Sequence, residues 1–122
     1  MSQKVFSANE ALPERTTAAY VAYFRTPRGA TIPGSAITSV LMTLTAQPSG
    51  DVINGRNAHE TIGDNGSVTA DGEYQLILDP ADLVMVGDSG MQQRLMVLNV
   101  TYTDGEIPHV VTFFVKNNPG VP

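Results

Sequence analysis

The fold is decided by residues 92–116, which read QQRLMVLNVTYTDGEIPHVVTFFVK. Both halves of this stretch are rich in β-branched and aromatic residues, and the Thr103-Asp104-Gly105-Glu106 segment between them is typical of a turn. The stretch therefore predicts two antiparallel strands joined as a hairpin. Because side chains alternate between the two faces of a strand, one face is predicted to lie in the core. Its residues are Met96, Leu98, Val100, Tyr102, Ile107, His109, Val111 and Phe113.

The turn of this hairpin can be read with two lengths. Asp104-Gly105 favours a two-residue turn, because Asp and Gly adopt positive φ at low cost. That turn requires a backbone N–H at position 108 for the alternating hydrogen bonds, and Pro108 has none. The sequence therefore predicts a four-residue loop over 103–106, with Tyr102 paired with Ile107. Both lengths leave the same residues on each face.

The second face of the hairpin mixes apolar and polar residues, which is typical of a sheet face that is only partly covered. Its larger apolar residues include Leu95, Val97, Val110 and Phe114. We interpret these four as a candidate interface with another protein, because protein interfaces combine apolar side chains with a polar surround.

Length and composition limit the class of protein. With 122 residues and no cysteine, the chain is predicted to form one domain that is stabilised by packing alone. No apolar run reaches the length of a signal peptide or a membrane span, so we expect a protein made in the cytoplasm with no membrane partner. The net charge of −5 argues against nonspecific binding of nucleic acid.

Charge is unevenly distributed along the chain. Residues 1–56 hold five cations and three acids, a net charge of +2, whereas residues 57–122 hold two cations and nine acids, a net charge of −7. This asymmetry is either scatter over a small count or a sign of head-to-tail contact between copies or of docking on a charged partner. Arg25 and Arg28 share one loop and are candidate contacts for an anionic partner. The alternative is that they serve only solubility.

The order of patterns predicts one domain between two flexible ends. Residues 1–15 are polar, lack periodicity and contain Pro13, so they are predicted to be an arm that is flexible or ordered only against a partner. Residues 16–116 contain about seven short strand patterns, which predict an all-β sandwich of antiparallel strands, with a small barrel as the alternative. Within them, residues 79–82 predict one helical turn with a capping box. Residues 117–122 are predicted to be a flexible tail.

Few residues suggest chemistry. His59 and His109 are the only histidines, and neither lies at metal-ligand spacing from another histidine or a cysteine. The acids of residues 64–73 do not follow the spacing of an EF-hand loop, and no serine lies in a Gly-x-Ser-x-Gly elbow. We therefore expect a protein without catalytic activity, metal or cofactor.

Several segments together resemble a known family. They are IPGSAITSV (32–40), DVING (51–55), DGEYQLILDPAD (71–82), LNVTYTDG (98–105) and FFV (113–115). This succession of strands and turns resembles the small immunoglobulin-like virion proteins of tailed bacteriophages. The chain differs from antibody-type domains in lacking their tryptophan and paired cysteines.

The resemblance implies an immunoglobulin-like sandwich that acts as a capsid decoration or head accessory protein. It further implies location in the virion and contacts with other virion proteins or with further copies of the same chain. A tail or baseplate adaptor is one alternative. Another is a sugar- or receptor-binding module of an adhesin, which would need an exposed aromatic residue with polar neighbours in the loops.

Overall fold

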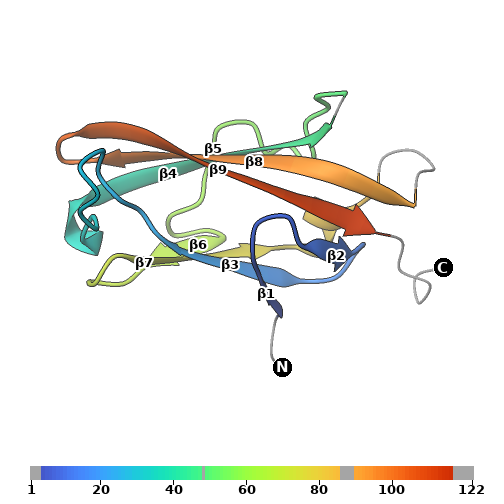
Figure 1. Ribbon diagram of the computed structural model, residues 1–122, viewed down its shortest axis with the longest axis horizontal. Helices are drawn as coiled ribbons and strands as arrows, with labels where there is room; N and C mark the ends of the chain where they lie inside the picture. Colours follow the sequence, from blue (N-terminus) through green and yellow to red (C-terminus); the bar gives the residue numbers. More distant parts are fainter. Residues whose placement is uncertain (1–3, 48, 86–89, 117–122) are drawn as a thin grey trace.

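Two β-sheets pack face to face in the computed structural model of the protein, which describes residues 4–47, 49–85 and 90–116 (Figure 1). The four-stranded sheet has the order β1-β3-β7-β6, and the five-stranded sheet has the order β2-β9-β8-β4-β5. The strands are β1 (Lys4–Phe6), β2 (Ala11–Pro13), β3 (Ala18–Tyr23), β4 (Ile37–Gln47), β5 (His59–Glu60), β6 (Gly66–Val68), β7 (Glu73–Leu78), β8 (Met91–Tyr102) and β9 (Gly105–Lys116). The predicted all-β sandwich is confirmed.

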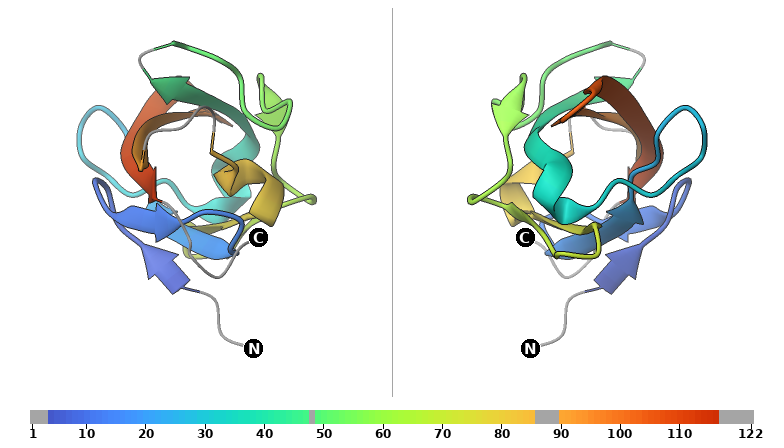
Figure 2. Two further views of the ribbon diagram at one scale, coloured as in Figure 1. Left: turned by 90° about the vertical axis from the view of Figure 1, so that its right-hand side faces the viewer. Right: turned by 90° about the vertical axis from the view of Figure 1, so that its left-hand side faces the viewer.

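Two strand pairs are parallel, which corrects the prediction that all strands are antiparallel. β1 runs parallel to β3, and β2 runs parallel to β9. Parallel neighbours require a crossover connection. Here the chain leaves the four-stranded sheet after β1, enters the other sheet as β2 and returns as β3. The β1–β2 segment therefore covers one side of the sandwich, as the end views in Figure 2 show.

The prediction of a flexible arm over residues 1–15 is wrong for residues 4–15. Phe6 is 2% exposed and Leu12 is fully buried, so both belong to the core. The Phe6 ring centroid lies 5.4 Å from that of Tyr20 and 5.1 Å from that of Phe113. Strands of three residues are too short to show a period of two, which is why the sequence did not reveal them. Residues 1–3 and the predicted tail 117–122 lie outside the described residues.

The hairpin turn also differs from the prediction. Tyr102 pairs with Gly105, so the loop consists of Thr103 and Asp104 rather than of four residues. The pairing is shifted by two residues, and a shift of two leaves every side chain on its predicted face. In the new register Pro108 lies opposite Asn99, a pair that the alternation of bonds leaves non-hydrogen-bonded. The missing N–H of Pro108 is therefore not needed by β8.

The predicted core face of the hairpin is confirmed for its central residues, and Tyr102, Ile107 and His109 are only partly buried. The opposite sheet supplies the inward residues Tyr74, Leu76 and Leu78 of β7, which the sequence also predicted. The buried residues of the hairpin are Met96, Leu98, Val100, Val111 and Phe113.

Two short 3₁₀ turns connect the sheets, η1 (Gly34–Ala36) and η2 (Pro80–Leu83). η2 confirms the helical turn predicted over residues 79–82. The Asp79 N–H donates to Asp82 Oδ2 at 2.8 Å, which is the reciprocal bond of a capping box.

Leu12→Ala tests the structural role of the N-terminal segment. We expect it to lower the free energy of unfolding by about 2–4 kcal/mol, because a fully buried leucine leaves a cavity. Urea denaturation followed by circular dichroism measures this loss. The matched control is Val5→Ala in the same segment, where the side chain is 59% exposed and we expect a small change. Equal effects of the two substitutions would mean that the segment is not part of the core.

Candidate functional site

The predicted interface residues of the hairpin lie together on the outer face of the five-stranded sheet. Val97 pairs with Val110 on one side and with Thr43 on the other. Leu95 pairs with Thr112 in the adjacent row of this face. Phe114 follows at the next position of β9, between Gln93 of β8 and Ala11 of β2. The structure thus brings Leu95, Val97, Val110 and Phe114 into one continuous part of the sheet.

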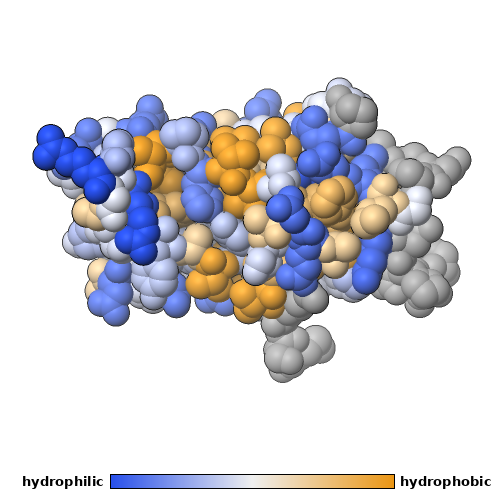
Figure 3. Space-filling model, viewed as in Figure 1, coloured by the Kyte–Doolittle hydropathy of each residue, from blue (hydrophilic) through white to orange (hydrophobic). Residues whose placement is uncertain are grey.

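Their exposure differs. Val110 is 57% exposed, whereas Leu95, Val97 and Phe114 are half-buried by their neighbours on the same face. Two further exposed apolar residues belong to this sheet, Met91 at the start of β8 and Val52, which forms a bridge to Thr45. The sequence did not indicate either residue, because Met91 lies one position before the predicted hairpin and Val52 belongs to an apolar segment of only two residues after a turn. Figure 3 shows that apolar side chains on one side of the molecule form separate groups among hydrophilic ones.

The outer face is poor in charge. Along β4, β8 and β9 its only charged residues are Glu106 and Lys116, which lie at opposite ends of β9. Glu60 stands at the edge, in β5, and its carboxylate accepts hydrogen bonds from Ser39 Oγ at 2.7 Å and from the Val40 N–H at 3.0 Å. Burial acts to raise the Glu60 pKa, but these and further backbone hydrogen bonds lower it below its ordinary value. Depletion of charge is typical of the centre of a protein interface.

Arg25 and Arg28 are not part of this face. Arg28 lines a hollow at the end of the sandwich together with Tyr102 and Asp104 of the β8–β9 turn. This end lies five pairs along the ladder from Val97 and Val110, about 16 Å at 3.3 Å per residue. Arg25 holds its own loop in place, because Nη1 donates to Gly29 O at 3.3 Å and to Thr31 Oγ1 at 3.1 Å.

The hollow has a volume of about 320 Å³ and is lined by Thr26, Pro27, Arg28, Tyr102 and Asp104. Both loops that line the hollow are held by backbone hydrogen bonds. The Thr26 N–H donates to Ala30 O at 2.8 Å, and the Thr103 N–H donates to Ala36 O at 3.0 Å. The hollow therefore combines one aromatic side chain with a guanidinium, a carboxylate and a hydroxyl on fixed loops.

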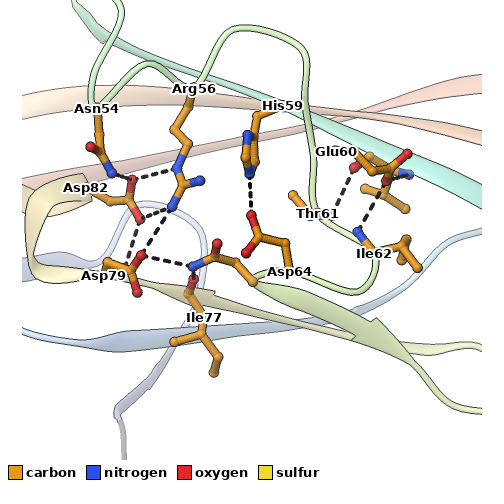
Figure 4. A network of polar contacts seen from close by, with 12 residues as sticks. Asn54, Arg56, His59, Glu60, Thr61, Ile62, Asp64, Ile77, Asp79 and Asp82 are labelled. Atoms are coloured by element: carbon orange, nitrogen blue, oxygen red, sulfur yellow. Dashed lines mark hydrogen bonds and ion pairs between the residues drawn. The ribbon is translucent and has the colours of Figure 1, made fainter.

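A polar cluster around the buried pair Arg56 and Asp82 joins the segment after β4 to η2 (Figure 4). Arg56 is 6% exposed, and its Nε donates to Asp82 Oδ1 at 2.9 Å while Nη2 donates to Asp82 Oδ2 at 3.2 Å. Asp79 Oδ2 lies 3.3 Å from the same Nη2, and Asn54 and Asn65 add further bonds to the two carboxylates. The hydrogen bond to Asp82 raises the Arg56 pKa. The sequence indicated the cap at Asp82 but not its partner, because Arg56 lies 26 residues away.

The two histidines occupy different polar contacts. His59 Nε2 lies 2.7 Å from Asp64 Oδ2 (Figure 4), and both side chains are solvent-accessible. His109 Nε2 lies 2.8 Å from the Tyr20 hydroxyl, across the gap between the two sheets, and its ring packs edge-on against Phe24. Burial lowers the His109 pKa and raises the Tyr20 pKa. The sequence placed His109 on the core side but did not identify Tyr20 as its partner.

Arg94 continues the core face of β8 and is fully buried. Its guanidinium donates to Gln92 Oε1 at 2.5 Å and to the Val84 carbonyl oxygen, while Nε has no partner among the described residues. Burial lowers its pKa. Within residues 4–47, 49–85 and 90–116, no three His, Cys, Asp or Glu side chains are grouped to hold a metal ion, and no helix is long and apolar enough to cross a membrane.

Arg56→Met tests the polar cluster. It leaves the buried Asp82 carboxylate without its cation, so we expect the free energy of unfolding to fall by about 3–5 kcal/mol. Chemical denaturation at neutral pH measures the change. The control is Arg25→Met, which removes an exposed guanidinium and should cost less than about 1 kcal/mol. A small effect at Arg56 would show that the cluster contributes little to stability.

His109 should make stability depend on pH. Because the His109 pKa is lowered in the folded protein, the unfolded chain binds the proton first, below about pH 6.5. The stabilisation that neutral His109 gives to the folded protein is therefore complete above that pH. It is lost as the pH falls toward the pKa of His109 in the folded protein. We expect His109→Gln to reduce the difference between the urea midpoints at about pH 7.5 and about pH 5.5, relative to the unsubstituted protein. His59→Gln is the control, and equal changes in both variants would contradict the assignment to His109.

No protein-family model matches the chain, and a search of curated proteins finds no significant match.

Proposed function

We propose that the chain is a non-enzymatic structural or accessory component of a bacteriophage particle, a capsid decoration or head accessory protein that acts through protein–protein contacts in the virion. The observation that carries the proposal is the outer face of the five-stranded sheet. Across three strands it exposes Val110 among half-buried apolar and uncharged polar residues, and its charges are confined to the ends of β9. Such a surface suits contact with another protein.

The order of the strands supports the immunoglobulin-like part of the proposal. Immunoglobulin domains divide their strands into an A-B-E-D sheet and a G-F-C sheet, which is extended in variable-type domains. β1-β3-β7-β6 and β9-β8-β4 follow the same order along the chain. The parallel pairs made by β1 and β2 depart from a purely antiparallel arrangement. A tail or baseplate adaptor would use the same fold and the same kind of surface.

The hollow at the loop end favours a second candidate function, a sugar- or receptor-binding module. It offers a partly exposed aromatic residue with polar neighbours, since Tyr102 lies beside Arg28 and Asp104. Binding of the protein to a glycan array, lost on Tyr102→Ala, would favour this candidate over the structural one.

Val110→Asp tests the proposed function. We expect the protein to co-sediment with particles encoded by the same genome, and the substitution to weaken this binding at least about tenfold, because it buries a carboxylate at the contact. The matched control is Val5→Asp, since Val5 is similarly exposed, at 59%, but lies on the four-stranded sheet. Thermal melting verifies that both variants are folded. The proposal fails if the unsubstituted protein binds no virion component.

A further inference from the structure

We infer that the outer face of the five-stranded sheet binds a second copy of the same chain, antiparallel across a two-fold axis, so that Lys116 of each copy faces Glu106 of the other. This inference rests on the proposed function, because both use the same face. It specifies the partner and the alignment of the two sheets.

The outward residues of β9 carry the alignment. In chain order they are Glu106, Pro108, Val110, Thr112, Phe114 and Lys116. The first and last have opposite charge, and the midpoint of the series lies between Val110 and Thr112. A two-fold axis through this midpoint, across the strands, places Lys116 on Glu106 of the second copy. It also places Phe114 on Pro108 and Val110 on Thr112, so apolar surface faces apolar surface or a threonine methyl.

The outward residues of β8 are also complementary when they are rotated about the same axis. Val110 pairs with Val97 and Thr112 pairs with Leu95, so the midpoint of β9 continues across the sheet to a point between Leu95 and Val97. Rotation about the axis then puts Leu95 on Val97 and Gln93 on Asn99 of the second copy. Apolar side chains meet apolar ones and amides meet amides, which makes the face self-complementary, as a two-fold interface requires.

The charges select this axis over the other two-fold arrangement in the plane of the sheet. An axis along the strands would stack β9 on β8, and Lys116 would lie over the Met91 row while Glu106 would lie over Thr101. No ion pair would form. Sheets that pack face to face keep their strands within about 30° of one another, so the antiparallel alignment is compatible with ordinary sheet packing.

The size of the face is sufficient for a weak dimer. Six outward positions on β9 span about 34 Å, and three strands span about 14 Å. The patch is therefore about 500 Å² on each copy, or about 1,000 Å² in total, which is near the lower limit for a specific interface.

Pairing through the edge of the sheet is less favourable than pairing through its face. β2 covers only Phe114, Val115 and Lys116 of β9, and among the described residues no strand covers 106–110. Phe114 directs its N–H toward the N-terminal segment, and Pro108 has the same orientation along the strand. Pro108 therefore removes a donor from the uncovered edge, a device that prevents strand addition.

Reciprocal charge reversal tests the inference by sedimentation equilibrium of the full chain. We expect a monomer–dimer equilibrium for the unsubstituted protein, weakened at least about tenfold by Lys116→Glu or by Glu106→Lys, because each substitution creates two like-charge contacts across the axis. The double variant Lys116→Glu/Glu106→Lys should restore the dimer. Asp71→Lys, in the exposed turn between β6 and β7, is the control for a change of charge away from the face.

The outcomes separate this inference from the proposed function. A chain that stays monomeric, or a dimer that the double variant does not restore, overturns the inference. If Val110→Asp still abolishes binding to particles in that case, the proposed function stands with a different partner on the face. If the dimer responds to the charge reversals as expected but no virion component binds, the inference is supported and the proposed function is contradicted.

Discussion

The alternation of side chains along β8 and β9 is the constraint on which the rest of the structure depends. These two strands place one row of residues between the sheets and the next row on the outer surface, over twelve residues each. Met96, Leu98 and Val100 are fully buried as a result, and β4 extends the same alternation with Val40, Met42 and Leu44. A shift of one residue would exchange the core with the surface, so hydrophobic burial excludes it.

The same constraint explains which features of the hairpin could be predicted from the sequence. The faces were predicted correctly because the pattern of apolar residues defines them. The predicted pairing of β8 with β9 differs from the observed pairing by two residues. Burial does not distinguish these two registers, because a shift of two residues leaves every side chain on the same face. Because Pro108 lacks an N–H, the sequence predicted a loop of four residues, whereas the observed loop has two. In the structure the backbone nitrogen of Pro108 faces the uncovered edge of β9. Pro108 therefore limits pairing with other strands and does not determine the length of the turn.

The features that the sequence did not reveal depend on contacts between distant residues. Phe6 and Leu12 are single apolar residues in short segments, and their burial follows only from where β3 and β9 lie. Arg56 and Asp82 are both polar, and a sequence contains no signal that two such residues will be buried as a pair. Arg94 has the parity of the core face, so alternation indicated its position, but its charge argued against burial. The candidate interface shows the same difference between local and distant contacts. Alternation predicted that Leu95, Val97, Val110 and Phe114 share one face, whereas the distance of Arg28 from them depends on how the strands are connected.

A strand pair with one face in the core has a second face whose composition is free to serve another purpose. Solubility alone would favour charged residues on that face, because charges keep a sheet surface hydrated and prevent association. On β8 the outward positions are instead Met91, Gln93, Leu95, Val97, Asn99 and Thr101, none of which is charged. Among the described residues, the acids lie in turns, near strand ends such as Glu106, in the edge strand β5 and in the Arg56 cluster. The chain as a whole is acidic, so the absence of acids from the centre of one sheet is a property of that surface and not of the composition. Contact with another protein is the physical use that such a surface supports, and the hairpin that builds the core also presents it.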